Sequence, residues 1–141
     1  MKKENCPYCY YGEALAKFGY LAFETETSAV IVFKDQSHPG RMIVAYKDHH
    51  VAEIQDLNDE KRNAFMKDVS DVAKAIQKAY NPDRINYGAY GDTLGHLHIH
   101  LVPKYKDEFE WGGTFVMNTG NYASEEEILS VAKKIIENFE A

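Results

Sequence analysis

Three histidines alternate with aliphatic residues in the segment 95–101, which reads GHLHIHL. In an extended strand successive side chains point to opposite faces, so His96, His98 and His100 are predicted to share one face and the aliphatic residues the other. The aliphatic face requires a core, and the opposite face becomes a row of imidazoles ~7 Å apart. Such a row is suited either to binding a metal ion or to supplying an imidazole nucleophile with hydrogen-bond donors beside it.

The two uses of the histidines place different demands on the strand. Zinc needs imidazoles that converge on one point, and because three alternate histidines lie nearly in a line, two of them plus a ligand from elsewhere close a tetrahedron more easily. A nucleophile needs a neutral imidazole whose second nitrogen is held as N–H by a carbonyl, with donors nearby for phosphoryl oxygens. His98 is the central candidate, His100 would flank it as a phosphate donor, and the turn 91–95 with Thr93 could bind the same anion. Both uses remain open at this point.

Two cysteines near the start of the chain form a second candidate site. Cys6 and Cys9 stand in the sequence Cys-Pro-Tyr-Cys and are the only cysteines. They are too few and too close for the disulfide framework of a secreted protein, so they indicate metal ligands or a redox pair in a reducing compartment.

Length and composition predict one globular domain over residues 1–141. The chain is 45% hydrophobic and 27% charged, which is ordinary for a protein with a packed core. Its formal charge of -6 argues against binding to a nucleic-acid polymer or a membrane surface. No stretch approaches the ~18 apolar residues of a membrane span, and no apolar run follows the charged N-terminus. We therefore expect a cytoplasmic protein.

The elements that must position these residues are predicted by periodicity and capping signals. Strands are expected at 20–23, 29–33, 41–46 and 85–90, with the histidine strand following after the turn 91–95. A long helix begins after Asn58 and ends before Asn81-Pro82, a second helix begins after Ser124, and residues 12–19 could hold a short helical turn. The fold class is α+β, with a five-stranded, mainly antiparallel sheet, a long helix and a C-terminal helix.

The segment 104–122 is long for a loop and is expected to carry function. Trp111 could stack on a base or form a dimer contact. Lys104 and Lys106 could attract polyphosphate, but lysines that follow a strand are more often solvated.

At this stage the sequence resembles the histidine-triad (HIT) family. The signature His96-Leu97-His98-Ile99-His100 matches, and further motifs fall in family order over essentially the whole chain: 6–9, 33–35, 40–44, Lys47 with a following histidine, 86–88 and 103–105. The resemblance implies a homodimeric α+β fold and a nucleotide hydrolase or transferase that acts at a phosphate bearing a nucleoside, commonly adenosine.

The resemblance also implies roles for individual residues. His98 would attack the α-phosphate and form a nucleotidyl-histidine, while His100 would orient the phosphate and help to protonate the leaving group. Asp35 would hold the ribose hydroxyls beside the apolar Phe33, and Asn86 matches the asparagine that precedes the triad. The turn residues Asp92, Thr93 and Leu94 complete the predicted nucleotide site.

Some family members bind zinc, and four residues match their ligands. These are Cys6, Cys9, His50 and His96, with His50 preferred over His49 because Ile54 and Leu57 then fall where the family has apolar residues. Two thiolates and two imidazoles form a chemically sound tetrahedral site. Its role would be structural, holding the N-terminus beside the histidine strand.

The sequence departs from the family at two positions. Arg41 stands where many members have histidine, and Asp92 stands where many have glutamine or asparagine. A carboxylate beside a phosphate is repulsive unless it is paired, protonated or turned toward ribose, so Asp92 leaves its own phosphate-binding role in question. The lead-in to the fourth strand is one residue tighter than in family members that cleave phosphoramidates, and this comparison favours the dinucleoside-polyphosphate or general nucleotide branch. Two other functions stay open, a metal-dependent hydrolase and a nucleotide-binding regulator with little turnover.

Overall fold

A five-stranded antiparallel sheet lies at the centre of the computed structural model, which describes residues 1–141. The strand order is β1-β2-β3-β5-β4, and every neighbouring pair is antiparallel. The strands are β1 (Gly19–Glu24), β2 (Ser28–Phe33), β3 (Met42–Tyr46), β4 (Arg84–Gly88) and β5 (His98–Lys104). The helices are α1 (Glu13–Ala16), the 3-10 turn η1 (Ile54–Asp56), α2 (Asp59–Tyr80) and α3 (Glu125–Asn138). The predicted fold class is confirmed.

Both long helices begin at the predicted caps. The side chain of Asn58 accepts a hydrogen bond from the Lys61 N–H at 2.9 Å, and that of Ser124 accepts one from the Glu127 N–H at 3.2 Å. Helix α2 ends where Asn81 takes a left-handed conformation with φ of 49°, which allows the backbone to leave the helix.

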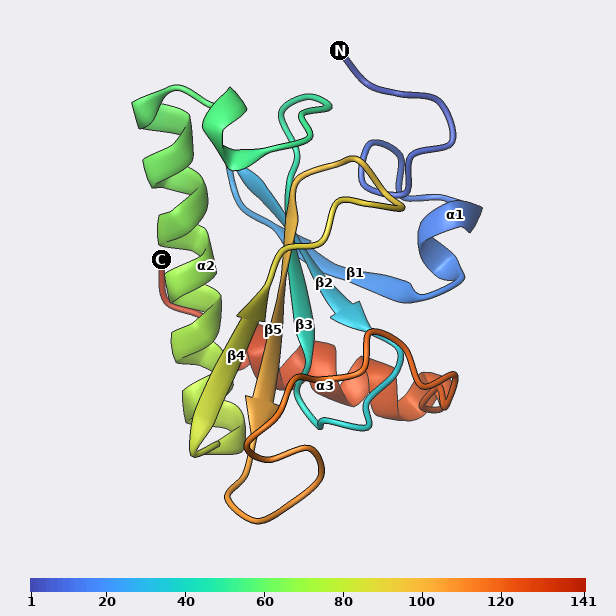
Figure 1. Ribbon diagram of the computed structural model, residues 1–141, viewed down its shortest axis with the longest axis vertical. Helices are drawn as coiled ribbons and strands as arrows, with labels where there is room; N and C mark the ends of the chain where they lie inside the picture. The colour runs from blue at the N-terminus through green and yellow to red at the C-terminus, as the bar shows by residue number, and fades with distance from the viewer.

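Helices α2 and α3 cover the same face of the sheet (Figure 1). Their apolar sides join inward residues of the strands in one cluster that includes Leu97, Ile99 and Leu101, so the predicted burial of the aliphatic face is confirmed. The opposite face of β2 and β3 packs against the N-terminal segment, which contributes Tyr8 and Leu15 to a second cluster. The central strands are therefore buried on both faces.

The histidine strand is shorter than its alternation predicts. Strand β4 ends at Gly88 rather than Tyr90, and β5 begins at His98, so His96 belongs to the loop 89–97. Pairing with β4 ends at Gly88, while the Leu97 carbonyl still accepts from the N–H of the β3 residue Tyr46 at 3.1 Å. The Leu97 N–H donates instead to the Val51 carbonyl at 2.7 Å. A Cβ at Gly88 would collide with the rings of Tyr90 and Phe115, which explains the glycine at the end of β4.

The residues 105–123 between β5 and α3 form a crossing loop that returns over the sheet face bearing His98 and His100. Lys104, at the end of β5, is buried and donates to the carbonyls of Glu110 and Gly113, so the expectation of a solvated lysine is wrong. At the other end of the loop, Tyr122 forms an isolated β-bridge with Asp35. Both ends of the crossing loop are thus anchored.

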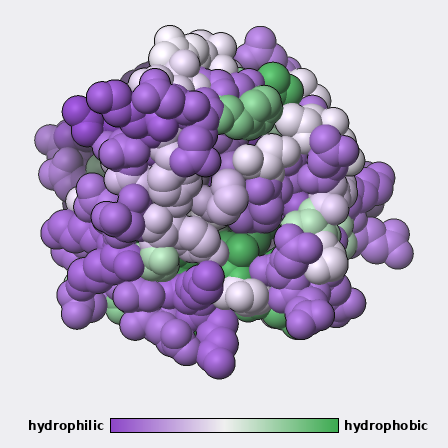
Figure 2. All heavy atoms as spheres, turned by 90° about the horizontal axis from the view of Figure 1, so that it is seen from below, coloured by the Kyte–Doolittle hydropathy of each residue, from purple (hydrophilic) through white to green (hydrophobic).

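Figure 2 shows a largely hydrophilic face with small apolar patches. None of the helices is both long enough and apolar enough to cross a membrane.

Candidate active site and metal centre

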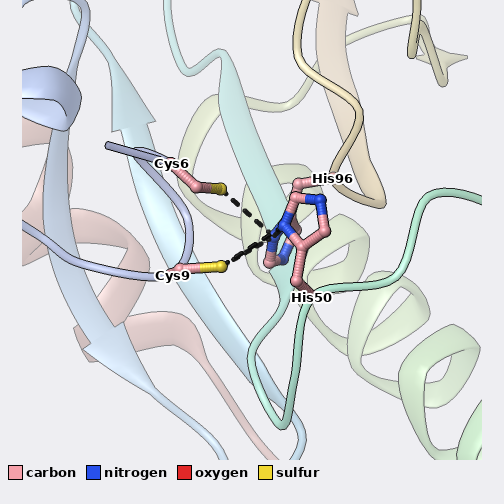
Figure 3. Close-up of side chains that lie close together, drawn as sticks. All are labelled: Cys6, Cys9, His50 and His96. Atoms are coloured by element: carbon pink, nitrogen blue, oxygen red, sulfur yellow. Dashed lines mark hydrogen bonds between the residues drawn. The ribbon is translucent and has the colours of Figure 1, made fainter. Parts of the chain in front are cut away.

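Four side chains from three distant segments form a possible metal-binding cluster. Cys6 and Cys9 come from the N-terminal segment, His50 from the segment after β3, and His96 from the loop before β5; their ligand atoms all lie within 4.8 Å of one another. Figure 3 shows the four side chains pointing toward one another. His49, the alternative ligand considered from the sequence, is half-buried, and its Nδ1 lies 3.3 Å from the Asp48 carboxylate. The structure therefore brings together the four predicted metal ligands, and the histidine from the segment after β3 is His50 and not His49.

The donor atoms of the cluster fit a tetrahedral ion. The His96 Nδ1 lies 3.4 Å from each cysteine Sγ and 3.2 Å from the His50 Nδ1. Ligand atoms around a tetrahedral zinc ion are ~3.3–3.8 Å apart, given Zn–S of ~2.3 Å and Zn–N of ~2.0 Å. The His96 Nε2–H donates to the Tyr46 carbonyl at 2.6 Å, which leaves Nδ1 as a bare lone pair facing the thiols.

The protonation states of the cluster are compatible with a bound metal ion. Burial raises the pKa of the Cys6 thiol and lowers the pKa of His96 to about 4, so neither charged form is favoured in the protein alone. A metal ion stabilises thiolates and requires neutral imidazoles. The residues present therefore fit a bound metal.

His98 presents one nitrogen as a lone pair. Its Nδ1 lies 2.6 Å from the His96 carbonyl, and because a carbonyl can only accept, Nδ1 carries the hydrogen and Nε2 is free. Burial lowers the pKa of His98, so the ring is neutral at ordinary pH. The Tyr8 ring lies against it with 4.6 Å between centroids. A neutral, oriented imidazole with a free Nε2 is the form that a nucleophile requires.

His100 is held in the opposite tautomer from His98. The Arg41 guanidinium lies 3.1 Å from the His100 Nδ1. Arginine can only donate, so Nδ1 accepts and Nε2 carries the hydrogen. Burial, followed by the positive charge of Arg41, lowers the pKa of His100 to about 2. His100 is therefore a neutral N–H donor beside the free nitrogen of His98.

The two histidines open into a cavity of about 590 Å³, a size typical of small-ligand sites. Its lining combines aromatic side chains with a few polar ones: Tyr8, Lys17, Phe18, Phe33, Tyr90, Asp92, Thr93, Leu94, His98, His100, Met117, Asn118 and Tyr122. An aromatic wall beside oriented imidazoles can hold a flat, polar-edged molecule against a nucleophile.

A family model described as the HIT domain matches residues 20–107. The chain belongs to the HIT family. Among curated proteins, the bis(5'-adenosyl)-triphosphatase of Dictyostelium discoideum is 27% identical over 106 residues, which cover 72% of this chain and 70% of that protein.

Solved HIT structures share the fold. A histidine triad protein from Sinorhizobium meliloti superposes with a TM-score of 0.84 at 21% identity, covering 95% of this chain and 99% of that one. A zinc-bound histidine triad family protein from Mycobacterium smegmatis superposes with a TM-score of 0.64 at 17% identity, covering 92% and 94%. Identities this low show likeness of fold.

Not all residues expected from the HIT resemblance reach the cavity. Phe33, Asp92, Thr93 and Leu94 line it together with His98 and His100. Asp35 does not: its buried carboxylate accepts hydrogen bonds from the backbone and hydroxyl groups of Ser37 and Thr119. The carboxylate that faces the cavity is that of Asp92.

Asn86 also lies outside the main cavity. It lines a separate pocket of about 300 Å³ with Arg84, Lys104, Trp111 and two glycines, so Trp111 does not border the main cavity either. Asn86 and Trp111 therefore lie in a different pocket from His98, where they would not contact a nucleotide bound in the main cavity.

Several cavity residues were missed by the sequence reasoning, and most of them fall outside the matched HIT range of 20–107. They are Tyr8, Lys17, Phe18, Tyr90, Met117, Asn118 and Tyr122, of which Tyr90 alone lies inside that range. Tyr8 could have been found, since it lies between the two cysteines of the predicted metal site. The residues of the crossing loop carry no periodic signal, and only their contacts reveal them.

Proposed function

We propose that this HIT protein is a nucleotide hydrolase or transferase that cleaves at the α-phosphate of a purine nucleotide conjugate through a nucleotidyl-histidine on His98. The observation that carries the proposal is the hydrogen bond from the His98 Nδ1–H to the His96 carbonyl, which frees Nε2 beside the cavity. The name of the Dictyostelium relative, a bis(5'-adenosyl)-triphosphatase, supports a dinucleoside polyphosphate as substrate.

The cavity suits a nucleoside monophosphate unit. Tyr8, Phe18, Phe33 and Tyr90 supply aromatic surface for a purine, while the Thr93 hydroxyl and the His100 Nε2–H can donate to oxygens. Asp92 is assigned to the ribose hydroxyls rather than to phosphate, because a carboxylate beside a phosphate would be repelled.

The proposed reaction has two displacement steps. The Nε2 lone pair of His98 attacks the α-phosphorus, a P–N bond forms, and the bond to the leaving group breaks with its electron pair. The His100 N–H donates to a phosphoryl oxygen as charge develops there. Water then attacks the same phosphorus, gives up a proton, and breaks the P–N bond to release the nucleotide and neutral His98.

We propose zinc as the ion of the cluster formed by Cys6, Cys9, His50 and His96, in a structural role. The zinc-bound histidine triad family protein from Mycobacterium smegmatis supports this identity. Four protein donors fill a tetrahedral shell, whereas catalytic zinc sites keep one position for water. When bound, the ion would supply a cross-link between the N-terminal segment and the loop 89–97. The same donor count weighs against a metal-dependent hydrolase.

We further propose a homodimer in which the two copies meet at β4. This strand pairs only with β5, so its other edge is open, and Tyr87 on it is 58% exposed. Beside it lies an apolar groove of about 460 Å³ whose lining includes Met66, Val69, Ala73 and Ile99.

The covalent intermediate can be tested by intact-protein mass spectrometry after a brief incubation with diadenosine tetraphosphate. The parent protein should gain an adenylyl group, and His98→Ala should gain none and lose turnover by about 10³-fold or more. His49→Ala, which removes a half-buried histidine outside both the metal cluster and the cavity lining, is the matched control and should behave like the parent.

Two outcomes would contradict the proposed function. Turnover of His98→Ala within tenfold of the parent would exclude His98 as the nucleophile. Tight AMP binding by the parent, with no adduct and no turnover, would favour the nucleotide-binding regulator.

A further inference from the structure

Arg41 is a buried cation that the reaction described above does not use. It directly precedes β3 and is 2% exposed. Its guanidinium carbon lies 4.2 Å from the centre of the Phe33 ring and 4.8 Å from that of Phe115, so the group is held between two aromatic faces. The sandwich leaves the guanidinium little freedom to rotate.

The hydrogen bonds of Arg41 fix the direction of its remaining donors. One terminal nitrogen donates to the Val116 carbonyl at 3.1 Å, and the other donates to the Met117 carbonyl at 2.8 Å and to the His100 Nδ1 at 3.1 Å. The Nε–H has no partner. The crossing loop, the two rings and His100 thus enclose the guanidinium from all sides.

No carboxylate forms an ion pair with Arg41; Asp35 and Glu110 act on it only from a longer distance. The guanidinium is therefore a positive charge without a contacting counter-ion, and one of its hydrogen-bonded neighbours is the His100 ring. A second positive charge on that ring would be adjacent to the first in a low-dielectric interior. The geometry excludes protonation of His100 at Nδ1 as well, because that nitrogen already accepts from an obligate donor.

The neutral tautomer of His100 limits which leaving groups the site can expel. When a phosphoanhydride is cleaved, the electron pair of the P–O bond leaves on a phosphate oxygen, which is stable as an anion and needs no proton. When a phosphoramidate is cleaved, the pair leaves on nitrogen, which must gain a proton to depart as an amine. A neutral His100 could give that proton only by becoming an imidazolate, which is strongly unfavourable.

We propose that Arg41 is a positioning residue that holds His100 as a neutral N–H donor, and that the site consequently favours phosphoanhydride substrates over phosphoramidates. This inference rests on the proposed function for its substrate class. It also departs from the second role implied for His100 by resemblance, that of protonating the leaving group. Histidine at position 41, which many HIT members have, could exchange protons with His100, whereas arginine cannot.

The state of His100 can be measured without any turnover. Long-range ¹H–¹⁵N spectra of the full-length protein should show His100 neutral and protonated at Nε2 from about pH 8 to pH 5. In Arg41→His the Nδ1 acceptor bond is no longer enforced, so His100 should exchange between tautomers or titrate within this range. A parent His100 that is protonated at Nδ1, or that becomes charged above pH 5, would overturn the proposal.

Selectivity is measured by comparing kcat/KM for diadenosine tetraphosphate and adenosine 5'-phosphoramidate. The parent should prefer the anhydride, and in Arg41→His the ratio of phosphoramidate to anhydride activity should rise by about tenfold or more. Arg41→Lys keeps a cation and should keep the parent's preference. Arg62→His, a half-buried position on α2 outside the cavity lining, is the matched control and should leave the ratio unchanged.

The outcomes separate this inference from the proposed function. Equal loss of both activities in Arg41→His, with the ratio within threefold of the parent, would reduce Arg41 to a structural role. A parent that prefers the phosphoramidate would overturn the inference even if Arg41 variants fail to fold. If the parent forms no adenylyl adduct, the proposed function fails, and the spectra still decide the state of His100.

Discussion

Each histidine of the triad is held in one protonation form by a different neighbour. The Tyr46 carbonyl fixes His96 with its lone pair toward the thiols, and the His96 carbonyl fixes His98 with its lone pair toward the cavity. Arg41 fixes His100 in the opposite tautomer, with its N–H toward the cavity. One sequence motif therefore supplies a metal ligand, a nucleophile and a donor, because each ring has a different hydrogen-bond partner that selects its tautomer.

Asp35 shows how a residue expected in the substrate site can act instead on the scaffold. Burial opposes its ionisation, but hydrogen bonds from Ser37 and Thr119 outweigh that effect and lower the pKa of the carboxyl group. The contribution of the carboxylate to stability is thus present above its unfolded pKa of ~3.9 and lost as the pH falls through the folded value.

We expect Asp35→Ala to lower the free energy of unfolding at pH 7 by about 2–4 kcal/mol, because the Ser37 and Thr119 donors lose their shared acceptor. Urea unfolding at pH 7 measures the change. Asp92→Ala removes an exposed carboxylate without hydrogen bonds and should change stability by less than ~0.5 kcal/mol. Equal effects of the two substitutions would refute the structural role of Asp35.

At the scale of elements, segments without regular structure position the site. The N-terminal segment places Tyr8 against His98 through the same residues that carry Cys6 and Cys9. The crossing loop covers Arg41 with its carbonyls and is held to the sheet by Lys104. Strand β5 fixes the two reacting histidines, and these two segments form the cavity around them together with the loop 89–97 and Phe33 of β2.

The metal cluster gives a prediction about the N-terminal segment. Protein purified under reducing conditions should contain one zinc per chain by elemental analysis, and His50→Ala should lose most of it. The zinc-free variant should melt several degrees lower, because the ion no longer links the N-terminal segment to the loop 89–97. His49→Ala should retain zinc and melt with the parent. If both variants retain full zinc, His50 is not a ligand.

The sequence predicted those features that depend on short spacing. Alternation at 95–101 predicted the core face of β5 from residue type and local geometry. The spacing of the cysteines left a metal site or a redox pair open, and the HIT resemblance supplied the set of four ligands that the structure brings together. The contacts that complete the site join residues far apart in the chain: Arg41 and His100 are 59 positions apart, and Asp35 and Thr119 are 84 apart. No local pattern encodes such contacts, which explains why Asp35 was assigned to ribose and Arg41 was noted only as a departure.

At the scale of the whole molecule, the sheet has two outer strands with different surroundings. On β1, Tyr20 is 40% exposed, and α1 and α3 pack nearby. On β4, Tyr87 is more exposed and lies beside the apolar groove lined in part by Ile99. An open edge that continues into an apolar groove offers both backbone pairing and hydrophobic burial to a second copy. We therefore expect β4 to form the dimer contact.

Introducing a negative charge on β4 or on β1 tests which edge of the sheet forms the dimer contact. Light scattering coupled to gel filtration should give the parent a mass near twice its 16.1 kDa, and Tyr87→Glu should shift it toward a single chain, because the interface would bury an unpaired carboxylate. Tyr20→Glu places the same charge on the opposite edge and should leave the dimer intact. If Tyr20→Glu alone dissociates the protein, the copies meet at β1. A parent that elutes as a single chain at micromolar concentration would exclude the proposed homodimer, and the cavity around His98 would then be complete within one chain.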